Sequence, residues 1–263
     1  MENEDPTRKL QALIDADGIV YRAGFSADAQ LKKEAREAEP MASDEQIAQM
    51  LAETDYENIA LHNVKTTVQS IVDRFPINPA RVYLHKEGNY REALATLRPY
   101  KGNRDANHKP KYYREIKDYL FKHWNAEPVC GIETDDRLGI IQYEAPYGST
   151  VICSNDKDML TIPGFHYNWT KDELCEVSPE EADMMFYWQM LVGDSSDNIP
   201  GIYKVGPKTA TKMLAPCHTN EQARAVVQQA YKKEYGDKWE LAYREVGALL
   251  YIRRYELGDC PLL

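Results

Sequence analysis

The stretch LVGDSSDNIPGIYKVGPKTATKML, residues 191–214, places acidic side chains a few positions before lysines. Asp194 and Asp197 come first, and Lys208 and Lys212 follow a turn that contains glycine and proline. Carboxylates hold hard cations such as Mg²⁺, and lysines bind phosphate groups. No packing requirement explains this order of residues. The stretch therefore predicts metal-assisted chemistry on a nucleic acid.

Acidic residues also follow several predicted strands. One of them alone would be explained as a helix N-cap, but the carboxyl ends of parallel strands meet at one edge of a sheet. Carboxylates gathered there repel one another unless cations neutralise them, and oxygen ligands without His or Cys select Mg²⁺ or Mn²⁺. Two such ions can promote phosphodiester hydrolysis. The acids in question are Asp15, Asp17, Glu133, Asp135, Asp136, Asp156, Asp158, Asp194 and Asp197.

The elements that must position these acids alternate between strand and helix over the first 190 residues. This alternation predicts an α/β fold with a mostly parallel central sheet flanked by helices. Beyond about residue 190 only helices and turns are expected, so we predict a domain over 1–190 and a helical subdomain over 191–263. The predicted strands are KLQALIDADG, ARVYL, PVCGI, STVICS, FHYNW and ELCEV. The predicted helices cover about 43–75, 111–124, 133–145, 178–194, 199–215, 220–235 and 237–255.

Composition and charge narrow the class of protein. The chain has 263 residues and a net charge of −10, with 14 acids and six bases over residues 1–60. Residues 98–123 reverse this balance, with eight bases and three acids, and either a phosphate-binding band or a solvated helix explains them. The five cysteines form no C-x-x-C pair, and no apolar run suggests a membrane span or a signal peptide. We expect a protein of the cytoplasm.

Five motifs in this order resemble the 5′ nucleases, a family that includes phage 5′→3′ exonucleases, flap endonucleases and the nuclease domain of bacterial DNA polymerase I. The resemblance runs from about residue 13 to residue 214. It implies a PIN-like 5′ nuclease fold with a helical arch over about 86–125 and a C-terminal helix-turn-helix of the H3TH type. The motifs are LIDADG, YKGNR, ETDD, SNDKDML and GDSSDNIPGI.

The resemblance also implies roles for the acids. Two Mg²⁺ ions per site are expected, for which Mn²⁺ can substitute. Asp17 lies at a position where the match to the motif is weaker. We expect it in the outer shell of the metal site, without direct contact with the ion. The first metal would be held or positioned by Asp15, Glu133, Asp135, Asp136 and Asp156, and the second by Asp158, Asp194 and Asp197.

Basic and aromatic residues around YKGNR resemble the foot of the family's arch. Lys101 and Arg104 would contact the scissile phosphate and act in catalysis with Asp15, Asp135 and Asp156. Tyr100 would stack on the terminal base, or is an ordinary half-buried tyrosine. Arg91 resembles the family's arginine before the arch, or belongs to a surface ion pair.

The segment IPGIYKVGPKTATKML resembles the family's helix-turn-helix, which grips duplex DNA. Gly206 would let the backbone turn closely, the amides near Gly206 and Thr209 would meet a phosphate, and Lys208 and Lys212 would add charge. The resemblance also suggests K⁺ bound by carbonyls of the turn. Lys204 stands where the family has glycine, which predicts strain if that position has positive φ.

A second departure lies after the second predicted strand, where the family has an aspartate. This chain reads Leu84, His85 and Lys86 there. Either Glu87 substitutes, or the first metal lacks one ligand and binds less tightly.

The expected function is divalent-metal-dependent hydrolysis near 5′ ends or flaps of DNA, as a 5′→3′ exonuclease or flap endonuclease in phage replication, primer removal or repair. The partner is DNA with a 5′ end, flap or nick, or an RNA/DNA hybrid, and a monomer is expected. Two alternatives remain. DADG and GDSSDN imitate motifs of haloacid dehalogenase-type phosphatases, and the missing aspartate is compatible with a DNA-junction binding protein of weakened catalysis.

Overall fold

The computed structural model describes residues 9–105, 108–256 and 260–263. The chain forms two compact units. Unit 1 comprises the described residues within Met1–Leu84 and Ala106–Pro128, and unit 2 those within His85–Asp105 and Val129–Leu263. No helix in these described ranges is both long and apolar enough to cross a membrane.

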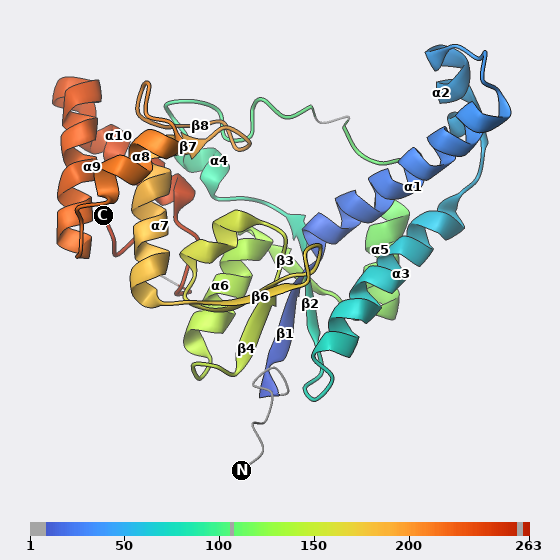
Figure 1. The fold of residues 1–263 in the computed structure, drawn as a ribbon, viewed down its shortest axis with the longest axis horizontal. Coiled ribbons are helices and arrows are strands. Elements are labelled where there is room, and N and C mark those ends of the chain that lie inside the picture. The colour runs from blue at the N-terminus through green and yellow to red at the C-terminus, as the bar shows by residue number, and fades with distance from the viewer. Residues whose placement is uncertain (1–8, 106–107, 257–259) are drawn as a thin grey trace. The chain divides into compact units, whose positions relative to one another are not determined.

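Helices and strands alternate along the chain up to β6 (Figure 1). In chain order the elements are β1 (Gln11–Asp15), α1 (Ala16–Ala38), α2 (Asp44–Glu53), α3 (Glu57–Arg74), β2 (Arg81–Glu87), α4 (Arg91–Leu94), α5 (Tyr113–His123), β3 (Glu127–Cys130), α6 (Thr134–Glu144), β4 (Thr150–Cys153), the 3₁₀ helix η2 (Lys157–Thr161), β5 (Gly164–Asn168), β6 (Glu173–Val177), α7 (Pro179–Val192), β7 (Gly193–Asp194), β8 (Ile199–Pro200), α8 (Pro207–Leu214), α9 (Asn220–Tyr235), the 3₁₀ helix η3 (Gly236–Lys238) and α10 (Trp239–Leu250).

Unit 1 combines parallel strands with long helices. β1 pairs in parallel with β2, with Leu13 opposite Arg81. The centre of β1 is fully buried, as expected for a strand covered on both faces. Asp15 ends the strand and caps α1, which packs its small apolar residues against α3 and α5. The buried face of α1 consists of Ala16, Ile19, Val20, Ala23, Gly24 and Ala27.

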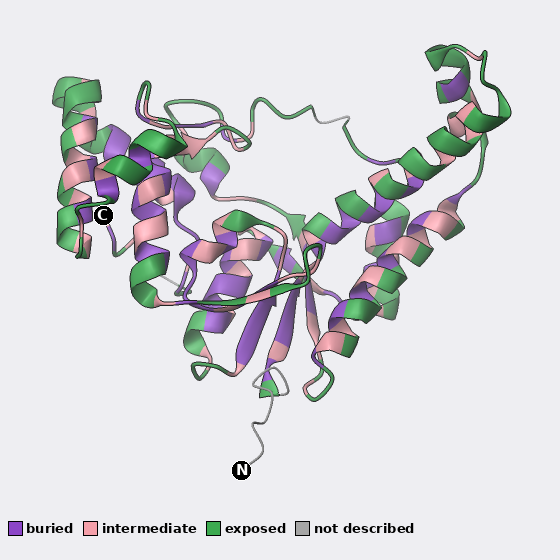
Figure 2. Cartoon of the chain, viewed as in Figure 1, coloured by how far each residue is buried: buried purple, intermediate pink, exposed green. Residues whose placement is uncertain are grey.

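Unit 2 has its own strands and a group of helices. β4 pairs in parallel with β5, with Val151 opposite Phe165, and β5 pairs antiparallel with β6. Every residue of β4 is buried, as its purple colour in Figure 2 shows. The strand pairings in the two units confirm the predicted α/β class with a mostly parallel sheet.

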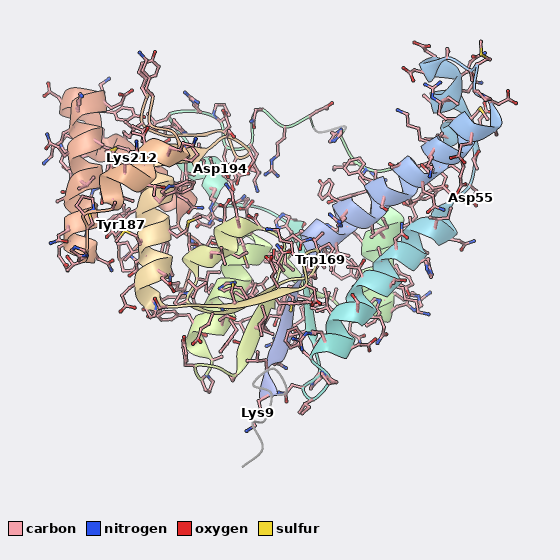
Figure 3. All side chains as sticks on the ribbon, viewed as in Figure 1. Lys9, Asp55, Trp169, Tyr187, Asp194 and Lys212 are labelled. Atoms are coloured by element: carbon pink, nitrogen blue, oxygen red, sulfur yellow. The ribbon has the colours of Figure 1, made fainter. Side chains whose placement is uncertain are left out.

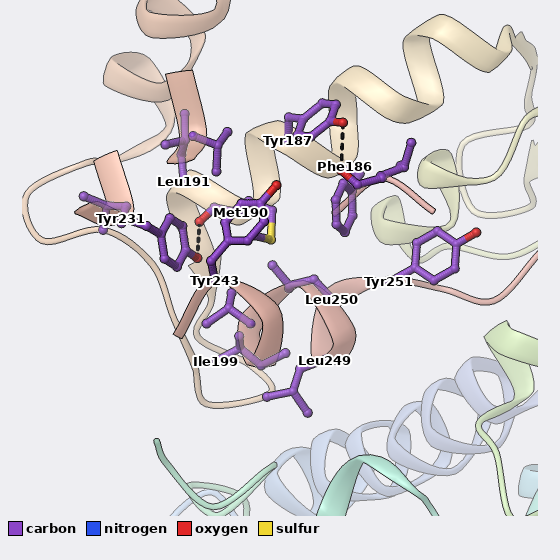
Figure 4. Packing of buried hydrophobic residues seen from close by; sticks show 14 of the residues in the cluster. Phe186, Tyr187, Met190, Leu191, Ile199, Tyr231, Tyr243, Leu249, Leu250 and Tyr251 are labelled. Atoms are coloured by element: carbon purple, nitrogen blue, oxygen red, sulfur yellow. Dashed lines mark hydrogen bonds between the residues drawn. The ribbon is translucent and has the colours of Figure 1, made fainter. Parts of the chain in front are cut away.

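The C-terminal helices of unit 2 pack around α7. Phe186, Tyr187, Met190 and Leu191 on α7 belong to one buried apolar cluster with residues of α9 and α10 (Figure 4). The Tyr231 hydroxyl of α9 donates to the Met190 carbonyl at 2.8 Å, which satisfies a buried polar group. This packing fixes the end of α7, and therefore the start of the segment that carries Asp194.

Three predictions of secondary structure need correction. The predicted helix over 43–75 is two helices, α2 and α3, interrupted at 54–56. α1 was not predicted, because alanines form much of its buried face and give a weak periodic signal. Near 199–215, where a turn and a helix were predicted, the helix is α8, and the small antiparallel ribbon of β7 and β8 before it was not predicted.

The compact units differ from the predicted division at residue 190. α7 packs both on η2 and on α8, α9 and α10, so the C-terminal helices share unit 2 with β4, β5 and β6. Because α7 packs on elements before and after it in the chain, its C-terminal end is not a linker between two separate domains. The division into a domain and a helical subdomain near residue 190 stays a prediction.

Candidate active site

A small cavity in unit 2 collects most of the predicted acids. Its volume is about 100 Å³, and all of its lining residues belong to unit 2. Besides the acids it is lined by Tyr100, Lys101, Arg104, Gln189 and Ser196, among others. The lining acids are Glu133, Asp135, Asp156, Asp158, Asp194 and Asp197.

Element ends bring these acids together. Glu133 caps α6, and Asp156 caps η2 directly after β4. Asp194 follows Gly193, whose φ is +73° and which lies so close to Gly201 that a Cβ would fall 2.3 Å from the Gly201 nitrogen. Only glycine fits there. Figure 3 shows Asp194 in this segment after α7, and Lys212 on α8.

On one side of the cavity the acids are paired with bases, and we call Glu133 and Asp197 the paired wall. The Lys101 ammonium forms an ion pair with Glu133 and lies 3.7 Å from Asp197, and Arg104 pairs with Asp197. The Tyr100 hydroxyl lies 2.8 Å from Glu133 Oε2 and 2.7 Å from Asp197 Oδ2. Because a hydroxyl carries one hydrogen, it bridges the two carboxylates and donates fully to only one at a time.

The two acids of the paired wall titrate differently. Burial opposes ionisation of Glu133, but the charges of Lys101 and Arg91 hold its pKa below the ordinary value. Burial raises the pKa of Asp197, and Lys101 and Arg104 only partly offset this. The cations therefore compensate Glu133 more completely than Asp197.

The YKGNR turn is tied to the segment that follows Asp194. The Lys101 amide donates to the Asp197 carbonyl at 2.9 Å, and the Asn103 side chain donates to the Ser195 carbonyl at 2.7 Å. Lys101 has a φ of +54°, which a non-glycine residue adopts only when its surroundings hold it there. These bonds hold the basic residues against the acids.

On the other side we call Asp156, Asp158 and Asp194 the open wall. Asp156 accepts a hydrogen bond from the Asp158 amide at 2.9 Å, and Asp194 accepts from the amide and hydroxyl of Ser196. Asp158 accepts from Gln189 at 2.7 Å, and exposed Lys157 lies 4.0 Å away. Burial and the charges of Asp156 and Asp194 raise the pKa of Asp158 to about 6. The negative charge on this wall is poorly compensated by the described residues.

Asp135 is the sixth acid of the cavity. It sits in the first turn of α6 and accepts a hydrogen bond from the Asp136 amide at 2.7 Å. Burial, followed by the charges of Asp136 and Glu133, raises the pKa of Asp135 well above its ordinary value. Like the open wall, this carboxylate is placed where a cation would stabilise its charged form.

Arg91, which is among the residues that line the cavity, forms a buried pair with Asp136. The Arg91 side chain is 1% exposed and contacts both Asp136 oxygens, at 2.5 and 2.8 Å. It also donates to the carbonyls of Leu249 and Tyr251. Asp136 accepts a further bond from the Arg253 amide. This geometry ties α4 and α6 to the end of α10. The predicted contacts of Arg91 with DNA and of Asp136 with metal stay predictions.

Other predicted residues are not among those that line the cavity. Asp15 and Asp17 belong to unit 1, where Asp15 accepts from the Asp17 amide at 3.1 Å and caps α1. Glu87, the possible substitute ligand, is exposed and is not among the residues that line the cavity. Tyr100 is 9% exposed, which favours the buried interpretation of this side chain over the stacking one.

The described residues contain no group of three or more His, Cys, Asp or Glu side chains arranged to hold a metal ion. Two of the six cavity acids are paired with bases, and uncompensated carboxylates keep apart. The donor chemistry nevertheless fits a hard divalent cation, since the open wall offers only oxygen ligands. Gln189 adds a buried carbonyl oxygen without a hydrogen-bond partner among the described residues.

α8 presents the predicted basic face. Pro207 is its first residue, and Lys208, Thr209 and Lys212 are exposed while Ala210 and Leu214 are buried. The expectation for Gly206 was wrong, since its φ is −91° and a Cβ would meet nothing within 4 Å. The positive φ falls at Lys204, at +62°, which confirms the strained backbone predicted there.

Sequence reasoning missed Gln189 and Ser196 in the cavity lining. The signal for Gln189 was present, because it is an amide within FYWQMLV, an otherwise apolar run of a buried helix. Such a residue needs a polar partner.

The fold is that of the 5′ nucleases. It matches a zinc-bound structure of the phage T5 5′-exonuclease with a TM-score of 0.58 at 15% identity, covering 91% of this chain and 88% of that one. A structure of the phage T5 flap endonuclease with DNA and metal ions matches with a TM-score of 0.56 at 15% identity, covering 90% and 87%. At these identities the likeness shows the fold.

Sequence comparison points to the same class. Residues 181–248 match the family described as "5'-3' exonuclease, C-terminal SAM fold". The exonuclease of Escherichia phage T7 is 31% identical over 159 residues, which cover 57% of this chain and 52% of that protein. The chain thus spans little more than half the length of the curated relatives it matches first. Together these findings agree with the resemblance: the chain has the fold of the 5′ nucleases, and residues 181–248 match the 5'-3' exonuclease family.

Proposed function

We propose that this chain is a divalent-metal-dependent 5′ nuclease that hydrolyses phosphodiester bonds near 5′ ends or flaps of DNA. The observation that carries the proposal is the cavity that combines six carboxylates with Lys101 and Arg104. Carboxylates for cations and bases for phosphate are the two components that phosphoryl chemistry requires. The T7 relative is named an exonuclease and the T5 neighbour a flap endonuclease, which supports the same activity.

The open wall and Asp135 would hold the cations. When bound, the cations would supply Lewis acidity for the attacking water and the leaving oxygen. By the resemblance, Asp15 of unit 1 is a further ligand. Glu133 and Asp197 would join once a phosphate attracts Lys101 and Arg104 away from them. The roles of all these residues are part of the proposal.

The bases of YKGNR would act on the phosphate. Lys101 and Arg104 are paired with carboxylates, and a DNA phosphate offers each of them another anion. A cation held beside the reacting phosphate stabilises the charge that develops in the transition state. The turn that fixes the Lys101 backbone keeps this residue near the cavity during the exchange.

α8 would anchor the duplex away from the cut. Its exposed Lys208 and Lys212, with the amides at its first turn, suit a phosphate backbone. Lys204, next to the exposed Tyr203, extends the basic face. We keep K⁺ at this turn as part of the proposal.

Finer assignments belong to the same proposal. We infer Mg²⁺ as the working ion with Mn²⁺ as a substitute, DNA or an RNA/DNA hybrid as substrate, and a monomer as the working form. We also propose a role in phage replication, primer removal or repair in the host cytoplasm, as the resemblance implies. The exonuclease of phage T7 and the 5′-3′ exonuclease of Buchnera aphidicola support the choice of nucleic acid as substrate.

A cleavage assay tests the function. A DNA flap labelled at its 5′ end and a small phosphate monoester are incubated with the protein, with Mg²⁺ and with EDTA. Short 5′-labelled products in Mg²⁺ alone are expected. Release of phosphate from the monoester without DNA cleavage would favour the phosphatase, and a gel shift without cleavage would favour the junction-binding protein.

A further inference from the structure

Gln189 is a polar side chain in a buried and mainly apolar part of α7. It lies on α7, is 3% exposed, and neighbours Phe186 and Met190 of the apolar cluster in sequence. An amide buried without hydrogen bonds destabilises a fold. A leucine or methionine would suit the helix better, so the amide must serve the cavity that it lines.

One end of the amide is committed to Asp158. Its Nε2 lies 2.7 Å from Asp158 Oδ1. A carboxylate accepts hydrogen bonds, so an ionised Asp158 fixes which end of the amide faces it. α7 packs on η2, the element that carries Asp158, and its other side is held by the apolar cluster. The donor is therefore on a rigid support.

The other end of the amide has no protein partner. Gln189 Oε1 is buried and accepts no hydrogen bond from the described residues. With Nε2 directed to Asp158, this oxygen is an acceptor at the edge of a cavity that otherwise contains mainly acids. Water fits among ionised carboxylates, because it can donate one hydrogen to a carboxylate and the other to the amide oxygen.

We propose that Gln189 is a positioning residue, which fixes the Asp158 carboxylate toward the cavity and presents its own carbonyl oxygen to a water that donates inside it. This inference rests on the proposed function, because it gives Asp158 a cation to hold. Partners that orient metal ligands typically change metal affinity or activity by about 10- to 100-fold when mutated. Gln189 acts on Asp158 directly, through the hydrogen bond from its Nε2 to Asp158 Oδ1.

The test compares Gln189→Leu and Gln189→Met with Gln142→Leu. Gln142 is a matched control, a second buried glutamine in unit 2, 6% exposed, which donates to the Pro163 carbonyl and does not line the cavity. Mn²⁺ is titrated into the metal-free full chain by calorimetry, and affinity for a flap DNA is measured in EDTA. We expect about 10- to 100-fold weaker Mn²⁺ binding in both Gln189 variants, DNA affinity within twofold of wild type, and unchanged Mn²⁺ affinity for the control.

A double-mutant cycle tests the route through Asp158. If Gln189 acts through this carboxylate, Gln189→Leu causes no further loss of Mn²⁺ affinity in an Asp158→Asn background. Equal losses in both backgrounds would overturn the positioning role. Should Gln189→Leu not fold by circular dichroism, the same cycle with the near-isosteric Gln189→Met decides.

Failure of the inference differs from failure of the proposed function. A wild-type protein that binds Mn²⁺ and cuts the flap, while Gln189→Leu and Gln189→Met bind Mn²⁺ as tightly, overturns the role of Gln189 alone. A wild-type protein that neither binds Mn²⁺ nor cuts overturns the proposed function, and the positioning role with it.

Discussion

The two walls of the cavity differ in what compensates their negative charge. In the paired wall Lys101, Arg104 and the Tyr100 hydroxyl satisfy Glu133 and Asp197. In the open wall the acids accept from backbone amides, Ser196 and Gln189, and the nearby base is an exposed lysine at 4.0 Å. Carboxylates with internal cations are stable as they stand, whereas those without them need a ligand of opposite charge.

This difference separates two roles that acids and bases play in the proposed reaction. In the paired wall, Lys101 and Arg104 are held by carboxylates and would bind the phosphate of the substrate instead. The open wall keeps affinity for a cation. The following variants test whether the walls behave in these two ways, beginning with the largest expected effect.

Removing a carboxylate of the open wall should remove activity. For Asp156→Ala we expect flap cleavage in Mg²⁺ to fall by roughly 10³-fold, since a bound ion contributes several kcal/mol and each 1.4 kcal/mol is tenfold in rate. DNA affinity in EDTA should stay within twofold, because α8 is untouched. Asp172→Ala, a change at an exposed acid outside the cavity, is the control. Wild-type turnover in Asp156→Ala would contradict the role of the open wall.

Removing a base of the paired wall should have two effects of opposite sign. For Lys101→Ala we expect cleavage to fall by about 10²-fold, through loss of a preorganised cation. Mn²⁺ binding should tighten a few-fold, because Glu133 loses an internal competitor. Lys157→Ala, at the exposed lysine beside the open wall, provides the comparison for a nonspecific change of charge. Weaker Mn²⁺ binding in Lys101→Ala would contradict the claim that Lys101 competes with the cation for Glu133.

A third pair of variants acts outside both walls. Lys208→Ala with Lys212→Ala should weaken binding of duplex DNA and reduce the slope of log affinity against log salt by about two, nearly one for each lost phosphate contact. Cleavage at saturating DNA should change little. The exposed lysines Lys32 and Lys65 of unit 1, changed together to alanine, form the matched control. An unaltered slope in the α8 variant would remove that helix from the DNA-binding surface.

The smallest effect concerns stability alone. Burial lowers the pKa of His166 to about 4 from 6.5, so the unfolded chain binds a proton between these pH values and the folded chain does not. The contribution of neutral His166 is complete above pH 6.5 and is lost as the pH falls toward 4. We expect His166→Gln to flatten this part of the stability curve by about 1 to 3 kcal/mol, measured by urea unfolding. An identical pH dependence in both proteins would show that His166 does not control it.

Local signals explain why much of the fold was predictable. Ser43 with Gln46 and Ser178 with Glu181 form capping boxes, and Pro179 and Pro207 occupy first helical positions. These capping interactions join residues within four positions of one another, so they can be predicted from the sequence alone. α1 escaped prediction because its start coincides with the acidic motif and its buried face is poor in large apolar residues.

The candidate site was predictable in composition and less so in geometry. Acids after strands and the bases of YKGNR were identified, and the cavity contains most of them. The pairing of Arg91 with Asp136 joins residues 45 positions apart, and only the fold determines that they meet inside the protein. Gln189 acts through an orientation that no sequence pattern encodes.

Direct measurement of cation binding is the sharpest test of the difference between the walls. Mn²⁺ is titrated into the metal-free wild-type chain and into a variant that combines Asp156→Asn, Asp158→Asn and Asp194→Asn. Saturable binding that the triple variant loses, while it still binds duplex DNA in EDTA, is the result we predict. Equal Mn²⁺ binding by both proteins would contradict the account.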